Sequence, residues 1–152
     1  MTQVWLYHLE RHSLSQVLPG LLEKSLERGW KAVVQATSLD QVAALDKGLW
    51  DFRADSFLAH GTAQDGDGEM QPVYLTTGVE NPNGAVIRFC VDGADPAPVL
   101  GQPEYRRIMV IFDGNDEGAL ALARRQWADM KGLDLERAYW RENGEGRWEK
   151  KG

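Results

Sequence analysis

The sequence predicts a three-layer α/β domain with a Rossmann-like, mostly parallel sheet. Apolar runs of strand length alternate with amphipathic segments of helix length along most of the 152 residues. Strands joined through helices form parallel sheets that helices cover on both faces. No internal repeat or long linker divides the chain. Residues 1–152 are therefore expected to fold as one domain around one core.

Each expected strand is a short run rich in β-branched and aromatic residues. The runs are residues 4–9, 32–36, 57–60, 73–77, 86–91, 107–112 and 138–141, with a short extension at 147–149. The runs at 32–36 and 107–112 are almost continuously apolar, which is typical of strands buried on both faces.

Amphipathic segments between these runs predict three helices. The residues that mark their starts and ends are Ser13 and Gly29, Ser38 and Trp50, and Asn115 and Gly132. Ser13 with Gln16, and Ser38 with Gln41, have the spacing of helix-opening capping pairs. Pro19 removes one hydrogen-bond donor, so either the first helix bends there or its regular part starts there.

Composition indicates a soluble cytoplasmic protein. The start of the chain lacks the basic and apolar regions of a signal peptide, and no run approaches the ~20 apolar residues of a membrane span. One cysteine, Cys90, excludes an internal disulfide. A net charge of −6 argues against direct DNA binding, because non-specific affinity comes mostly from cations that neutralise phosphates.

Sequence signatures of catalysis are largely missing. There is no phosphate-binding Gly-x-x-x-x-Gly-Lys motif, and the loop after the first strand, residues 10–13, has no glycine. Neither a metal-ligand cluster nor a Gly-x-Ser-x-Gly elbow occurs, so no cofactor, metal or catalytic residue is expected. The alternative is a small cytoplasmic α/β enzyme with a site built from Cys90, His60 or acidic residues.

The last predicted helix carries the most informative pattern. Arg124, Trp127 and Lys131 are spaced to lie on one side of it. The neighbouring face should pack on the sheet and contains Ala119, Leu122, Ala123, Met130 and Leu133. The ordinary interpretation is a boundary tryptophan beside two cations with solvent-exposed head groups. The functional one is a site for a peptide with an aromatic end and acidic residues, in which Arg124 binds a carboxylate and Lys131 attracts at longer range.

A second pair of aromatics, Trp50 and Phe57, is predicted where a helix ends and a strand begins. Such aromatics usually belong to a core. The pattern Leu-Asp-x-x-Leu-Trp50, Ser-Phe57-x-x-His60 and later Ala-Arg124-x-x-Trp127-x-x-x-Lys131 resembles the chi subunit of bacterial DNA polymerase III. The resemblance extends to four further segments, at residues 4–9, 22–30, 80–85 and 111–113.

This resemblance implies a non-catalytic adaptor in DNA replication. It would join the clamp-loader assembly, through a small psi subunit, to the acidic C-terminal tail of single-stranded-DNA-binding protein, with DNA contacted only indirectly. The positions matching Trp50, Phe57, Arg124 and Trp127 form the tail pocket in that family. Ala128 stands where some relatives carry a lysine, which implies weaker affinity for the tail.

The psi-binding surface cannot be located from periodicity. Six tryptophans in 152 residues are more than a core of this size requires, and tryptophan is enriched at interfaces. Trp5, Trp140 and Trp148 are the candidates for that surface. Residues 137–152 carry five cations and three acids, a small basic excess with no assigned role.

Overall fold

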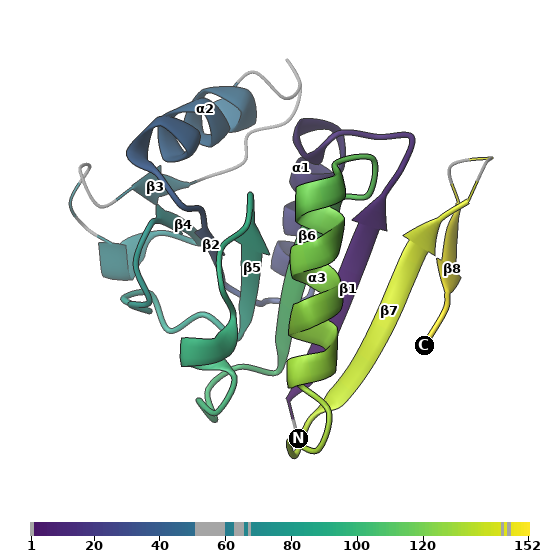
Figure 1. Ribbon diagram of the computed structural model, residues 1–152. Coiled ribbons are helices and arrows are strands. Elements are labelled where there is room, and N and C mark those ends of the chain that lie inside the picture. The colour runs from purple at the N-terminus through teal and green to yellow at the C-terminus, as the bar shows by residue number, and fades with distance from the viewer. Residues whose placement is uncertain (1, 51–59, 63–65, 67, 144, 146) are drawn as a thin grey trace.

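One sheet runs through the part of the chain that the computed structural model describes, which excludes residues 1, 51–59, 63–65, 67, 144 and 146, and the side chain of Trp50 (Figure 1). Its strands are β1 (Gln3–Leu9), β2 (Ala32–Gln35), β3 (Gly61–Thr62), β4 (Val73–Thr76), β5 (Ile87–Val91), β6 (Arg107–Asp113), β7 (Glu136–Glu142) and β8 (Trp148–Lys150). The spatial order is β3-β4-β2-β5-β6-β1-β7-β8. All neighbouring strands are parallel except β7 and β8, which form an antiparallel edge. The predicted fold class is therefore confirmed.

Helices cover both faces of this sheet. The described α-helices are α1 (Leu14–Glu27), α2 (Leu39–Trp50) and α3 (Glu117–Asp129). Two short 3-10 helices are also described, η2 (Gly68–Met70) between β3 and β4 and η3 (Ala97–Val99) between β5 and β6. Buried residues of α1 and α2 share one apolar cluster, and those of α3 belong to the cluster on the opposite face. Within the described ranges, no helix is both long and apolar enough to span a membrane.

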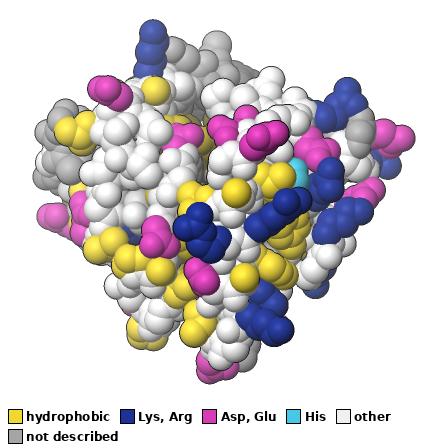
Figure 2. All heavy atoms as spheres, in the orientation of Figure 1, with side chains coloured by type: hydrophobic (Ala, Val, Ile, Leu, Met, Phe, Trp, Pro, Cys, Tyr) yellow, Lys and Arg dark blue, Asp and Glu magenta, His cyan; other side chains and the backbone are white. Residues whose placement is uncertain are grey.

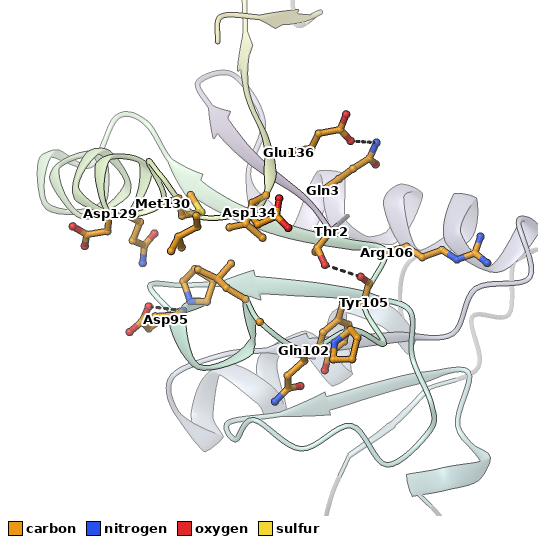
Figure 3. A pocket seen from close by; sticks show the side chains of 18 of the residues that line it. Thr2, Gln3, Asp95, Gln102, Tyr105, Arg106, Asp129, Met130, Asp134 and Glu136 are labelled. Atoms are coloured by element: carbon orange, nitrogen blue, oxygen red, sulfur yellow. Dashed lines mark hydrogen bonds between the residues drawn. The ribbon is translucent and has the colours of Figure 1, made fainter.

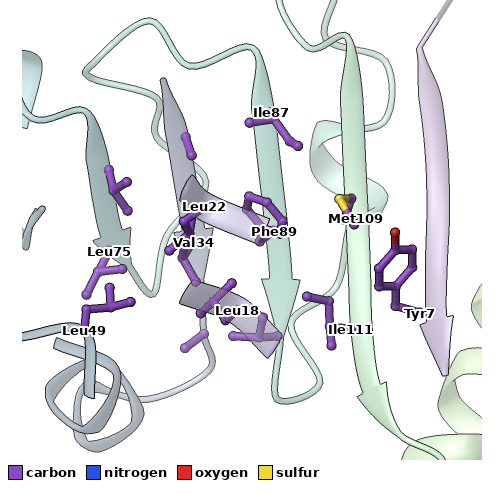
Figure 4. Close-up of a cluster of buried hydrophobic side chains, with 14 of the residues drawn as sticks. Tyr7, Leu18, Leu22, Val34, Leu49, Leu75, Ile87, Phe89, Met109 and Ile111 are labelled. Atoms are coloured by element: carbon purple, nitrogen blue, oxygen red, sulfur yellow. The ribbon is translucent and has the colours of Figure 1, made fainter. Parts of the chain in front are cut away.

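The alternation of side chains along the central strands builds both clusters. In β1, Val4 and Leu6 face α3, whereas Tyr7 and Leu9 face α1. Figure 4 shows Leu18 and Leu22 of α1 over the middle strands, beside Phe89. Full burial of a side chain such as Phe89 contributes roughly 1.5–3 kcal/mol relative to exposure. The sheet is thus a rigid scaffold for residues at its helices and its β7–β8 edge.

Helix beginnings follow the predicted caps with one correction. The Ser13 N–H donates to Gln16 Oε1 at 2.8 Å, and Ser38 Oγ accepts from the Gln41 N–H at 3.2 Å. In α3 the predicted cap was wrong by one residue: Asp116 caps the helix, and its Oδ1 accepts from two N–H groups of the first turn. Two adjacent cap-forming residues cannot be distinguished by composition.

Helix ends and interiors also differ in places from the prediction. Pro19 lies inside α1, which begins five residues earlier at Leu14. The third helix ends at Asp129, and Gly132, three residues later, has a φ of 87°. Because the helix has ended, Leu133 does not pack on the sheet as predicted but is 49% exposed.

Of the predicted third strand, residues 57–60, only His60 lies within the described residues, and it is not part of a strand. The described strand of this region is β3, which follows at Gly61 and pairs in parallel with β4.

Candidate binding surface

Alternate residues of β7 face the same side of the sheet as α3. The parallel register pairs Val4 with Arg137, Leu6 with Tyr139 and His8 with Arg141. Since Val4 and Leu6 face α3, the three β7 side chains paired with this row do so as well. Together with two residues of α3 they form a surface, here called the cationic strip, of Arg124, Trp127, Arg137, Tyr139 and Arg141.

Trp127 lies at the centre of the cationic strip. The Arg137 guanidinium lies 4.1 Å from the centroid of its indole ring, and Arg137 Nη1 donates to the Trp127 carbonyl at 2.5 Å. The Tyr139 ring meets the indole edge-on with centroids 5.7 Å apart. A guanidinium that close to an aromatic face is a cation–π contact. These contacts hold a half-buried indole in a fixed orientation beside positive charge.

Arg124 and Lys131 lie on either side of Trp127 along the chain, and both are exposed. Arg124 lies within α3, but Lys131 follows the end of the helix, so the expectation that all three share one helix side was wrong for Lys131. Neither cation makes an ion pair with any residue in the described ranges. Their charges are therefore available to an external anion.

Charges of the cationic strip affect a buried histidine, His8. His8 is 4% exposed, and its Nδ1 hydrogen-bonds to the Tyr139 hydroxyl at 2.7 Å. Burial lowers the pKa of His8, and the charges of Arg141 and Arg124 lower it further. His8 is therefore neutral at pH 7. Figure 2 shows Lys and Arg side chains gathered over α3 and the β7–β8 edge of this face.

The predicted pocket also included two aromatics from the region of α2. Phe57 and the Trp50 side chain lie outside the described residues. The helices that carry Trp50 and Trp127 cover opposite faces of the sheet. Of the predicted site residues, the structure therefore brings Arg124 and Trp127 onto one surface, with Lys131 just beyond the helix. The sequence interpretation missed Arg137, Tyr139 and Arg141, although the Arg-x-Tyr-x-Arg spacing has the period of one strand face.

The residues proposed for the enzyme alternative are far apart. Cys90 is fully buried on β5, and burial raises its pKa to about 12, which removes the thiolate needed for nucleophilic attack. His60 precedes β3 and hydrogen-bonds to Asp46 Oδ1 of α2 at 2.8 Å. Strands β4 and β2 lie between β3 and β5. This arrangement does not support a Cys90–His60 catalytic pair.

In nucleotide-binding Rossmann folds, the backbone N–H groups of the loop after the first strand bind a phosphate. In this protein the Glu142 carboxylate accepts hydrogen bonds from the N–H groups of that loop. Glu142 Oε1 accepts from the N–H groups of Glu10, Arg11 and His12 at 3.0, 2.8 and 3.1 Å. Burial opposes ionisation of Glu142, but its hydrogen bonds from His12 and these N–H groups prevail and hold its pKa at about 2. In the described part of the chain, no group of three potential ligands is arranged to hold a metal ion.

A second surface, the aromatic face, lies on the α1 side of the β1–β7–β8 edge and consists of Trp5, Tyr7, Trp140 and Trp148. Trp5 and Trp140 have ring centroids 5.5 Å apart, and Tyr7 stacks on Trp148 at 4.4 Å. The Arg107 guanidinium lies 3.8 Å from the centroid of the Trp5 ring. The three tryptophans are half-buried, which leaves part of each indole at the surface.

These observations define a class: a Rossmann-like α/β domain in which the backbone N–H groups after β1 are bonded by Glu142 and in which cations surround Trp127 on the α3 side of the sheet. The chain belongs to the family described as "DNA polymerase III chi subunit, HolC", whose model matches residues 1–137. A curated relative from Rickettsia prowazekii, "Probable DNA polymerase III subunit chi", is 31% identical over 117 residues, which cover 74% of this chain and 71% of the relative.

Similarity to a solved structure supports the fold alone. The C-terminal domain of the DEAD-box protein Dbp5 superposes with a TM-score of 0.56 at 14% identity, over 91% of this chain and 90% of that domain. At that identity the likeness shows a shared α/β architecture and carries no function.

Proposed function

We propose that this protein is a non-catalytic accessory subunit of DNA polymerase III that links the clamp-loader assembly to the acidic C-terminal tail of single-stranded-DNA-binding protein. Family membership supports a role in DNA replication. The observation that carries the finer proposal is the cationic strip, in which the exposed Arg124 lies on the same helix as an indole held in place by Arg137, with the exposed Lys131 two residues beyond the helix end. Neither Arg124 nor Lys131 makes an ion pair with a residue that the structure describes. An acidic peptide that ends in an aromatic residue has the complementary chemistry.

Arg124 is proposed to bind the terminal carboxylate of the tail, because a guanidinium pairs with a carboxylate in a bidentate geometry. Lys131 would attract the acidic residues upstream. A short peptide with one anchor should bind with micromolar affinity, about −8 kcal/mol. Removal of a central anchor costs about 2 kcal/mol or more, so Arg124→Ala should weaken binding some thirtyfold.

The test is titration of an acidic peptide ending in Phe against matched variants. Arg125→Ala is the control, since Arg125 is exposed on the same helix but is not part of the cationic strip. It should change affinity less than Arg124→Ala. Lys131→Ala should act mainly at low salt, because its contribution is long-range steering. Equal affinity for wild type and Arg124→Ala would place the tail elsewhere.

The aromatic face is proposed to contact a psi-type subunit. Partly exposed aromatic residues with a stacked guanidinium have the composition of interface cores. Trp148→Ser should reduce co-purification of a psi-type subunit and leave affinity for the acidic peptide unchanged. Arg124→Ala should weaken binding of the acidic peptide and leave co-purification of the psi-type subunit unchanged. Loss of both interactions in Trp148→Ser, with an unchanged melting temperature, would count against two separate surfaces.

A further inference from the structure

A hollow of the described surface shares no lining residue with either surface considered above. It has a volume of about 990 Å³ and opens between the C-terminal end of α3, the η3 segment and the first residues of β1 and β7 (Figure 3). Its apolar lining includes Leu100, Met130, Leu133 and Leu135. Leu133, at the edge of the hollow, is 49% exposed.

Charge is distributed unevenly around this hollow, here called the acidic groove. Its lining contains four carboxylates, Asp95, Asp129, Asp134 and Glu136, and one guanidinium, Arg106. Figure 3 shows Asp95, Asp129 and Asp134 around the Met130 side chain, whereas Arg106 extends away from them. Helix α3 ends at Asp129, so the negative end of its dipole adds to the same potential.

The lining also contains an amide that makes no hydrogen bond within the described part of the chain. Gln126 is only 9% exposed and lines the groove, yet its side chain makes no hydrogen bond to any other residue that the structure describes. The amide nitrogen and oxygen are not among the buried polar atoms that lack a partner, so they keep contact with solvent in the groove. They can therefore hydrogen-bond to the backbone or a side chain of a bound segment.

We propose that the acidic groove binds a peptide segment of a protein partner in which lysine or arginine side chains accompany apolar ones. The carboxylates would meet the cations, the lip at Leu133 would bury apolar side chains, and Gln126 would hydrogen-bond to the bound backbone. Nucleic acid is disfavoured, since the same carboxylates repel phosphates. The volume is at the upper limit of small-ligand sites, which suits a peptide better than a compact metabolite. The two flanks of α3 thus serve ligands of opposite charge.

The probe is a short, fluorescently labelled peptide of alternating lysine and leucine, titrated at physiological salt. Asp129→Asn/Asp134→Asn should weaken its binding about fivefold, as expected for two exposed charge pairs. The control Asp40→Asn/Glu69→Gln removes the same charge from exposed positions outside the groove and should have a smaller effect. Equal losses in the two double variants would reduce the binding to attraction by net charge and overturn the proposal.

Two further comparisons test the apolar part and the amide. Leu133→Ser should weaken the peptide about threefold, and Leu39→Ser, at an exposed leucine of α2, should not. Gln126→Met should weaken binding without lowering the melting temperature, because the amide has no internal partner to lose. Binding of spermine as tight as that of the peptide, or of a glutamate–leucine peptide at equal strength, would also overturn the proposal.

Discussion

Glu142→Gln should destabilise the protein by about 2 kcal/mol at pH 7. The wild-type carboxylate is buried and accepts three backbone N–H groups of residues 10–12 through one oxygen, and its other oxygen hydrogen-bonds to His12. Hydrogen bonds to a charged acceptor contribute about 1.5–3 kcal/mol each. The total for the variant is smaller than their sum, because glutamine retains one carbonyl oxygen as an acceptor.

The pH dependence of this effect has a definite sign. The folded pKa of Glu142, about 2, lies below its ordinary value of 4.5. The carboxylate therefore stabilises the fold fully above pH 4.5, and this stabilisation is lost as the pH falls toward 2. Urea unfolding of wild type and variant at pH 7 and pH 3 should give a smaller difference at pH 3. Glu136→Gln, at an exposed position of the same strand, should change stability by less than about 0.5 kcal/mol. An equal difference at both pH values would refute this account of Glu142.

Three other outcomes are expected. Gly114→Ala should lower the free energy of unfolding by about 2 kcal/mol or more, because the new Cβ would lie 2.8 Å from the Leu9 carbonyl oxygen and closer still to the His8 ring. Gly48→Ala lies in α2 with open space around the new Cβ, and thermal melts should show a gain in stability of up to about 1 kcal/mol. Cys90 should react with a thiol reagent far more slowly in the folded than in the unfolded protein, and equal rates would contradict its burial. Single-stranded DNA should bind weakly in anisotropy measurements at physiological salt, given the net charge of −6, and submicromolar affinity would contradict this expectation.

The fold was predictable because its sequence signals are local and mutually consistent. The apolar runs at 32–36 and 107–112 can be satisfied only by strands covered on both faces. What remained hidden depends on contacts between distant segments. Arg88 lies in a strand predicted from its apolar neighbours, yet it is fully buried and donates to Gln35 Oε1, to the Tyr105 hydroxyl and to the carbonyls of Gly78 and Glu80. No local pattern indicates that such acceptors converge.

In the candidate site, too, the local relations were predictable and the long-range ones were not. Helical spacing was sufficient to relate Arg124 to Trp127, because both belong to one element. Arg137 and Tyr139 could not be added without the register of β7 against β1, which assigns them to the face of α3. Lys131 was misplaced because the helix ends two residues before it, and the boundaries of a helix are its least predictable feature.

The most direct test of the adaptor proposal is amide chemical-shift mapping of the labelled protein during titration with an acidic peptide ending in Phe. The account predicts that the largest shifts fall on the α3 residues around Arg124, on the Trp127 indole N–H and on Tyr139 of β7. Shifts concentrated instead on the aromatic face or the acidic groove, with the Trp127 indole unchanged, would contradict it.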